Sequence, residues 1–479
     1  MAERPRARGD LPTMSATDAA DARTKDGEPT LDRSVTLFQI TLYGLGSMLG
    51  AGIYGLIGQA AGQLGSAVWM AFVVSMIAAM LTGLSYANVV SRHPKAGGAA
   101  YVTQRAYGIP LLSYVVGLAV VCSGLTSIAT QSNVVAASLQ KLLGLTAVPI
   151  WVLAFGFLLI IAGILLRGIK ESMWFNVMCT IIEASGLLLV IAVSVSYWGS
   201  NPLMEFPPEA SHNGEVGTIA VLVMQGAVLT FFSFIGFEDM LNVSEECKDA
   251  SRNVPLAIVL AMIGATVIYM AVAISAVSVM HYSELPKELA LVEVVKRAAP
   301  WFPPVILSVV TIFAVSNTAL VNWIMGSRLL YGMSKQGLMP QALGKVHPTR
   351  RTPHVAILTL LAIVAVLSLL GDIKALAQAT VLLLLTVFTA VNIALVILKR
   401  RPEEKPGQFE VPIIVPILGA IICATLIVVR MFQEGGLAAP AIAFGLIALI
   451  AVLYFVTGAG QDQERLQRFI EQDEAAAEA

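Results

Sequence analysis

Long apolar runs alternate with short polar stretches along almost the whole of this 479-residue chain. A helix that rises 1.5 Å per residue needs about 20 apolar residues to cross a bilayer. The runs predict twelve membrane-spanning helices, at about residues 35–61, 66–91, 111–138, 149–168, 173–198, 217–244, 254–281, 303–333, 354–371, 373–399, 411–432 and 437–458. The pattern therefore predicts an all-α, polytopic membrane protein.

The first predicted span contains a stretch that is poor material for a continuous helix. Five glycines occur between Gly44 and Gly55, and each costs about 1 kcal/mol relative to alanine in a helix. Interrupted backbone at membrane depth is tolerated only where it is buried in protein or lines a cavity. The ends of a broken helix offer N–H groups to an anion and carbonyl groups to a cation, as an α-amino acid would need. Close packing of helices against small residues is the alternative use of these glycines.

Residues 50–55 also fit the G-x-G-x-x-G pattern of dinucleotide-binding loops. That fingerprint requires a preceding strand in a soluble βαβ unit and an acidic residue about 20 positions downstream. Here the segment lies in an apolar run, and no Asp or Glu occurs between Asp32 and Glu171. The match is accidental.

A second interruption occurs in the sixth run, where Gly236, Glu238 and Asp239 follow a series of phenylalanines. Interrupted spans at corresponding places in two halves of a chain are a sequence sign of a transporter site. Spans one and six begin two units of five helices, and an odd number of helices inverts the second unit. We therefore expect a domain at 34–460, made of inverted repeats at 34–200 and 215–400 and two extra helices at 411–458.

The amino-acid composition is typical of a membrane protein and argues against several classes of function. Hydrophobic residues make up 57% of the chain and charged residues 13%, whereas soluble domains have about 25% charged residues. The net charge of −1 gives no reason to expect a nucleic-acid partner. The four cysteines and five histidines are scattered without ligand spacing, so we expect no metal, no cofactor and no enzyme activity.

The distribution of Lys and Arg predicts the orientation in the membrane. With the N-terminus inside, most basic residues fall in the tails and the cytoplasmic loops, which is the positive-inside pattern. Residues 1–33 lack the apolar core of a signal peptide and predict a disordered cytoplasmic tail. Residues 461–479 predict an acidic cytoplasmic tail. We expect a multi-pass protein of the cell (inner) membrane with both termini in the cytoplasm.

Four segments, in the right order, resemble motifs of the amino acid–polyamine–organocation (APC) permeases. The resemblance covers about residues 34–460, and Ala250 departs from it because the family commonly has proline there. The matching segments are G-A-G-I-Y at 50–54, G-I-K-E-S at 168–172, the F-x-G-F-[ED] motif with its downstream acidic run at 232–255, and the eighth-span run at 326–340.

This resemblance implies a LeuT-like inverted-repeat fold, with discontinuous helices 1 and 6 gripping the substrate between them. The substrate carboxylate would meet backbone N–H groups of Ala51, Gly52 and Ile53. Its ammonium group would meet carbonyl groups of Met48, Phe232 and Ile235, and the Phe232 ring would close over it. The candidate substrate-binding residues are Met48, Gly50, Ala51, Gly52, Ile53, Phe232, Ser233, Ile235 and Gly236.

Two acidic residues inside spans are candidates for proton coupling or gating. Glu183 lies ten residues into span five, where an exposed, ionised carboxylate would cost several kcal/mol, so we expect it to face the bundle. Many permeases that the chain resembles have a lysine at this position, thought to stand in for a sodium ion. We hypothesise that Glu183 or Glu238 binds the coupled proton. The alternative for Glu183 is a purely structural hydrogen bond between helices.

The sequence and the resemblance together favour a secondary active transporter of amino acids that works by alternating access, with a proton as co-substrate. The predicted core holds carboxylates and almost no cations, which favours neutral or cationic amino acids, or amines, over acidic ones. An amino acid or polyamine exchanger without proton coupling remains an alternative, as does a membrane amino-acid sensor that transports nothing. A potassium-channel filter, T-V-G-Y-G, is absent from the sequence.

Overall fold

The structure, a computed structural model, describes residues 29–145, 147–207, 216–286, 290–369, 374–431 and 438–458. Within these ranges the regular elements are helices, and an isolated bridge pairs Val35 with Cys247. Ten of the described helical segments are long and apolar enough to cross a membrane. The prediction of an all-α, multi-pass membrane protein is confirmed.

The predicted spans all correspond to helices, and their bounds set the frame for the site. The helices are α2 Leu37–Leu49, α3 Ala51–Leu64, α4 Val68–Arg92, α5 Gly98–Tyr107, α6 Pro110–Leu143, α7 Ile150–Arg167, α8 Ile169–Ser194, α10 Val216–Phe231, α11 Asp239–Asn242, α12 Ala250–Val279, α13 Ala290–Ala298, α14 Pro304–Lys335, α15 His354–Leu369, α16 Lys374–Arg400, α17 Ile414–Met431 and α18 Ala438–Thr457.

Two predicted spans have no counterpart among the ten long helices. The run at 35–61 is divided between α2 and α3, as its glycines predict, and neither half alone is long enough to cross a bilayer. The run at 354–371 corresponds to α15, whose 16 described residues reach Leu369, directly before the undescribed residues 370–373. The predicted divider between this run and the next lies at 370–373, outside the described residues. These two differences account for ten long helices where twelve spans were predicted.

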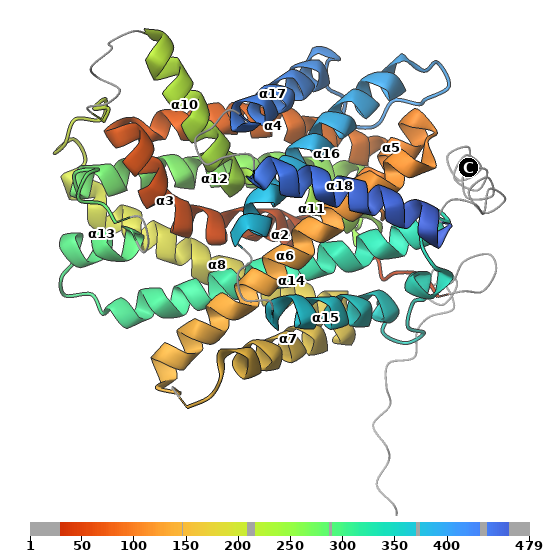
Figure 1. Cartoon of the computed structure of the whole chain (residues 1–479), viewed down its shortest axis with the longest axis horizontal. Helices are drawn as coiled ribbons and strands as arrows, with labels where there is room; N and C mark the ends of the chain where they lie inside the picture. Colours follow the sequence, from red (N-terminus) through yellow and green to blue (C-terminus); the bar gives the residue numbers. More distant parts are fainter. Residues whose placement is uncertain are drawn as a thin grey trace, which may run out of the picture.

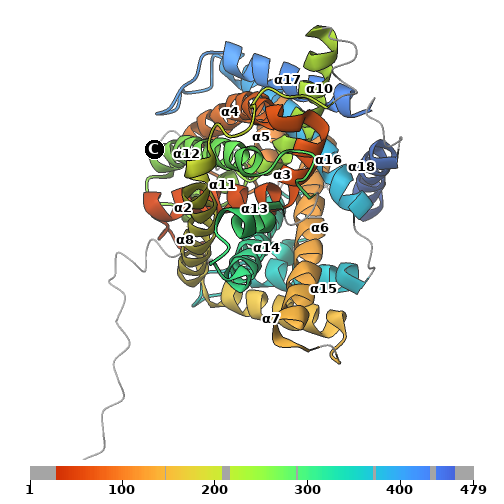
Figure 2. The same cartoon turned by 90° about the vertical axis from the view of Figure 1, so that its left-hand side faces the viewer.

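The short helices lie inside the bundle and the last two lie outside it. Figure 1 shows α2 and α11 near the middle and α17 at the upper edge, and Figure 2 shows α17 and α18 at edges of the bundle. Helix α2 packs against α8, α12 and α14, while α6 and α14 run against each other over much of their length. The interrupted backbone is therefore enclosed by protein, as an apolar environment requires.

The segment that precedes α2 is held against the bundle by hydrogen bonds. Thr36 caps α2: its hydroxyl accepts from Gln39 N, and the Gln39 side chain accepts from Thr36 N at 3.0 Å. Val35 N donates to Glu246 O at 2.9 Å, and the Arg351 guanidinium donates to backbone oxygens of residues 30 and 31 at 2.8 and 2.6 Å. Of the predicted tail, residues 29–33 therefore lie against the bundle, while residues 1–28 lie outside the described residues.

A fully buried ion pair joins α14 to the segment that follows α11. Arg328 Nε donates to Glu246 Oε2 at 2.9 Å, and Nη2 donates to Oε1 at 3.1 Å, so the contact is bidentate. Both side chains are 0% exposed. The guanidinium that the sequence places near the end of span eight is therefore neutralised inside the protein.

Replacing Arg328 by methionine should destabilise the protein by about 3–5 kcal/mol, because Glu246 would be left as a buried, unpaired carboxylate. The matched control is Lys296→Met, which breaks the exposed pair of Lys296 with Glu293 and should cost less than about 1 kcal/mol. Thermal unfolding of both variants in detergent measures the difference. Equal losses in the two variants would contradict this assignment, and the double variant Arg328→Met, Glu246→Leu should recover part of the loss.

A second set of ion pairs fastens the loop between α16 and α17. Glu410 accepts hydrogen bonds from Arg92 Nε at 2.7 Å, Asn88 Nδ2 at 3.0 Å and Gly407 N at 2.9 Å, and it also pairs with Lys399. Burial alone would raise the pKa of Glu410, but these hydrogen bonds lower the pKa to about 2. The ionised carboxylate therefore ties the loop to the ends of α4 and α16.

This contact predicts a pH-dependent contribution to stability. A carboxylate whose folded pKa is lowered stabilises the fold above its ordinary pKa of 4.5, and the contribution is lost as the pH falls toward about 2. Glu410→Gln should lower the melting temperature near neutral pH, and its difference from the parent protein should shrink below about pH 4. A difference that stays constant across this pH range would contradict the prediction.

Candidate functional site

The first interruption falls at Gly50. Helix α2 ends at Leu49, Gly50 adopts φ −52° and ψ −141°, and α3 begins at the next residue. Because N–H groups in the first turn of a helix have no intrahelical acceptor, Ala51, Gly52 and Ile53 carry N–H groups available to another partner. The carbonyl groups at the end of α2 are released in the same way. The backbone polarity expected from the glycines is present.

The second interruption is longer. Helix α10 ends at Phe231, a 3-10 turn η3 spans Phe232–Phe234, and Ile235 is extended with ψ 137°. Gly236 then takes φ +130°, a conformation that residues with side chains rarely adopt. The chain resumes helical structure at Asp239 in α11. The predicted break in span six is confirmed.

The two interruptions pack directly on each other through glycines. A Cβ atom at Gly52 would lie 2.7 Å from the Cα atom of Ser233, and one at Gly236 would lie 2.9 Å from the backbone carbon of Ser47. The Tyr269 hydroxyl lies 2.5 Å from Met48 O and 2.7 Å from Ser233 O, so one side chain bridges both broken segments. Bare backbone contacts of this kind require glycine.

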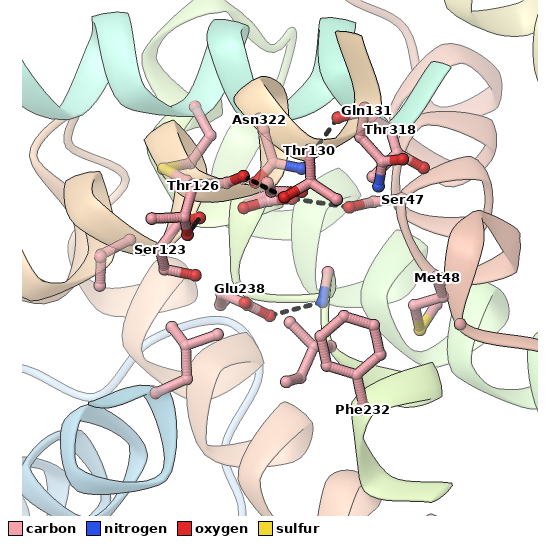
Figure 3. A pocket seen from close by; sticks show the side chains of 18 residues that line it. Ser47, Met48, Ser123, Thr126, Thr130, Gln131, Phe232, Glu238, Thr318 and Asn322 are labelled. Atoms are coloured by element: carbon pink, nitrogen blue, oxygen red, sulfur yellow. Dashed lines mark hydrogen bonds between the residues drawn. The ribbon is translucent and has the colours of Figure 1, made fainter. Parts of the chain in front are cut away.

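A cavity of about 100 Å³ opens beside this contact. A cavity needs roughly 10–15 Å³ by this measure to hold one water molecule, so the space suits a small solute. Figure 3 shows polar side chains from α6 and α14 on one side, Phe232 on another, and Glu238 between them. The cavity is lined by Ser47, Met48, Gly52, Val120, Ser123, Thr126, Ser127, Thr130, Gln131, Phe232, Ile235, Gly236, Glu238, Asp239, Thr318, Asn322, Met325 and Leu384.

The predicted site residues divide into those that line the cavity and those that lie behind it. Met48, Gly52, Phe232, Ile235, Gly236 and Glu238 line it. Ile53 and Ser233 are fully buried beside it, and Gly50 and the backbone of Ala51 form the break itself. Glu183 does not line the cavity.

Glu183 lies behind the first interruption. Its carboxylate is fully buried, and Oε2 accepts from Asn317 Nδ2 at 3.4 Å. A Cβ atom at Gly50 would lie 3.8 Å from Oε1 of Glu183, and Tyr54 of α3 donates to the Glu183 carbonyl at 2.8 Å. Oε1 has no hydrogen-bond partner among the described residues. The acid is thus held against the point where the first span breaks, as the sequence predicts for a residue that faces the bundle.

The acids of the second interruption face neutral groups. Glu238 Oε2 accepts from Gly236 N at 2.8 Å, and Asp239 Oδ2 accepts from the Ser47 hydroxyl at 2.6 Å. Both side chains are buried, and the cavity lining within the described residues includes no Lys, Arg or His. The cavity therefore carries acidic groups without a basic partner.

Sequence reasoning missed the side of the cavity built by α6 and α14. Its residues on α6 follow helical spacing within an apolar run, so hydroxyl and amide groups gather on one helix face. That spacing was a usable signal, because a polar face in a membrane span must be turned toward protein or water. The missed residues are Ser123, Thr126, Ser127, Thr130 and Gln131 on α6, and Thr318, Asn322 and Met325 on α14.

Two interrupted helices beside a cavity with polar and apolar lining, within a bundle of helices long enough to cross a membrane, are the arrangement typical of a membrane transporter. The family model described as amino acid permease matches residues 35–456, and the chain belongs to this family. Membership confirms the resemblance to APC permeases that the sequence motifs indicated.

Individual relatives agree on transport and differ in what their names say they carry. The chain is 27% identical to the branched-chain amino acid permease BcaP of Bacillus subtilis, over 84% of this chain and 89% of that protein. It is 30% identical to the methylthioribose transporter of the same organism, over 82% and 87%. It is 28% identical to the mouse cationic amino acid transporter 4, over 80% of this chain and 62% of that longer protein.

Two glycines of α3 provide a matched test of the backbone contact. Gly52→Ala should reduce ligand binding by at least about tenfold, since the added methyl group collides with the backbone at Ser233 and separates the two interruptions. Gly62→Ala on the same helix meets nothing within 4 Å and should leave binding unchanged. Binding to the purified variants, together with their melting temperatures, distinguishes a lost site from a lost fold. Equal binding by both variants would show that the close contact is unnecessary.

Proposed function

We propose that this protein is a secondary active transporter that moves neutral or cationic amino acids across the cell membrane by alternating access, with a proton as co-substrate. The observation that carries this proposal is the meeting of two interrupted helices at one small polar cavity. An amino acid has an anionic and a cationic group on the same carbon, and a broken helix supplies partners for both.

The substrate's α-carboxylate would bind the free N–H groups at the start of α3, at Ala51, Gly52 and Ile53. Its ammonium group would bind the carbonyl oxygens of Met48, Phe232 and Ile235. Met48 O already receives the Tyr269 hydroxyl, but a carbonyl oxygen has two lone pairs and can accept a second donor. Phe232 lines the cavity and would cover the bound molecule.

The absence of basic residues from the described cavity lining supports a neutral or cationic substrate. The buried Arg328 is not available to an anionic substrate side chain, because its Nε and Nη2 both donate to Glu246. An acidic side chain would bring a further negative charge toward Glu238 and Asp239, which is unfavourable in a low-dielectric interior. Relatives named for branched-chain and cationic amino acids are consistent with this class.

Glu183 is our candidate for the proton-binding group, with Glu238 as the second. Glu183 is fully buried with one oxygen lacking a partner among the described residues, and it touches the break in the first span. A buried carboxylate without a nearby cation is more stable in its neutral, protonated form. Binding or release of a proton at Glu183 would therefore be coupled to the backbone conformation where the first span breaks. Glu238 lines the cavity and could sense the substrate directly.

The proposal also includes the predicted arrangement of the repeats and the termini in the membrane. Inverted repeats at 34–200 and 215–400 would rock against each other around the fixed site, and α17 and α18 would form the extra pair. The excess of Lys and Arg in one set of loops supports both termini in the cytoplasm.

Uptake into proteoliposomes tests the transport mechanism. We expect a radiolabelled neutral or cationic amino acid to accumulate when the interior is alkaline and to show little accumulation when an ionophore removes the proton gradient. Accumulation that ignores the gradient and requires internal amino acid would instead support exchange. Binding without any flux would support a sensor.

Glu183→Gln should flatten the pH dependence of uptake, because the amide has the same shape but cannot exchange a proton. The matched control is Glu171→Gln, which changes an exposed acid in the first turn of the same helix. The rates of both variants should be measured across the pH range in which the parent protein responds. An unaltered profile in Glu183→Gln would assign that residue a structural role and direct the search to Glu238.

A further inference from the structure

The side of the cavity formed by α6 and α14 is not used by the proposed contacts to the α-carboxylate and α-ammonium groups. Beside the apolar side chains of Val120 and Met325, it presents a set of hydroxyl and amide groups to the cavity. Figure 3 shows Thr126, Thr130 and Gln131 of α6 near Asn322 of α14, on the side of the cavity away from Phe232. This polar wall consists of Ser123, Thr126, Ser127, Thr130, Gln131, Thr318 and Asn322.

The hydrogen bonds within the polar wall decide what it offers to a ligand. Thr130 donates its only hydroxyl proton to Thr126 O at 2.9 Å, and Thr318 donates to Ala314 O at 3.2 Å. Asn322 Nδ2 donates to Thr318 O at 2.8 Å. Once these protons are committed to the backbone, the oxygens of the two hydroxyl groups and of the Asn322 amide remain as acceptors. Glu238, across the cavity, adds carboxylate oxygens.

Gln131 contributes a buried amide group to the polar wall. Its side chain is 6% exposed, and no hydrogen bond to its amide occurs within the described part of the chain. A buried amide that lacks partners is costly, and this one lies at the cavity, where a ligand or water can reach it. The amide combines an acceptor oxygen with two N–H donors, so it can accept from a ligand and donate to it.

We infer that the polar wall, with Gln131 at its centre, determines specificity by recognising a hydrogen-bond donor on the substrate's side chain. Within the amino-acid class, on which this inference rests, the preferred substrates carry a hydroxyl, amide or amino group, and plain hydrocarbon side chains are disfavoured. A hydrocarbon would leave the acceptors of the polar wall without partners in a water-poor cavity, which is the condition under which polar sites discriminate strongly. A carboxylate side chain offers no donor and would face Glu238.

Shape-matched amino acids test this inference on the unmodified protein. Threonine and valine differ by a hydroxyl in place of a methyl group, and asparagine and leucine are similar in size. Binding of each to purified protein should be measured by thermal stabilisation or by competition with a bound radiolabelled amino acid. We expect threonine to bind at least about tenfold more tightly than valine, and asparagine more tightly than leucine or aspartate.

A pair of threonine variants connects the preference to the polar wall. Thr130→Val removes a cavity-lining hydroxyl that donates to the carbonyl four residues before it, and it should reduce the preference for threonine over valine severalfold. Thr311→Val removes a hydroxyl with the same kind of backbone bond, to Leu307 O, away from the cavity, and it should leave the preference unchanged. Gln131→Met should also reduce it while preserving side-chain length.

The outcomes separate this inference from the proposed function. If valine and leucine bind as tightly as threonine and asparagine, the polar wall does not select the substrate, although amino-acid binding itself stands. If no amino acid binds, the proposed function fails, and the inference fails with it. A preference for donors that persists in both Thr130→Val and Gln131→Met would also overturn the role given to the polar wall.

Discussion

The contact between two stretches of bare backbone governs the architecture of this transporter. Gly52 lies against Ser233, and Gly236 lies against Ser47, at separations that leave no room for a Cβ atom. Both helices must end for this contact to form. Each helix end leaves backbone N–H or C=O groups without an intrahelical partner, and the hydrocarbon core has no water to bond them. The Tyr269 hydroxyl lies within hydrogen-bond distance of two backbone carbonyl oxygens, those of Met48 and Ser233, and so links the two broken segments. The cavity opens beside this contact.

Charge is distributed around the cavity in a way that sets the site apart from the structural ion pairs. Arg328 and Glu246 neutralise each other in full burial, and Glu410 is surrounded by basic and amide groups at the end of the bundle. In contrast, the hydrogen bonds of Glu183 and Glu238 are to neutral groups. Carboxylates in such surroundings are stable when protonated or when a cation binds beside them. Under the proposed mechanism, a bound proton and the cationic group of the substrate would each stabilise these buried carboxylates.

Family membership identifies the class of protein, whereas the chemistry of the cavity bears on the choice of substrate. The match over residues 35–456 establishes the permease family, and it does so through a scaffold shared with relatives named for branched-chain amino acids, methylthioribose and cationic amino acids. That range of names means that the scaffold alone does not choose a substrate. Under the proposed function, the choice is made where the substrate side chain would meet the protein, at the polar wall of α6 and α14.

The sequence by itself determined the membrane class, the spans and both interruptions, because apolar length and clustered glycines act locally and need no knowledge of neighbours. Through a motif resemblance it also predicted a role for Met48, Gly52 and Phe232, which line the cavity. Only the tertiary structure brought Gln131 and Asn322 together at one cavity, placed Glu183 behind it and paired Arg328 with Glu246. These depend on which distant helices pack together, because the spacing of polar residues can indicate the inward face of one span but does not say which helix that face meets.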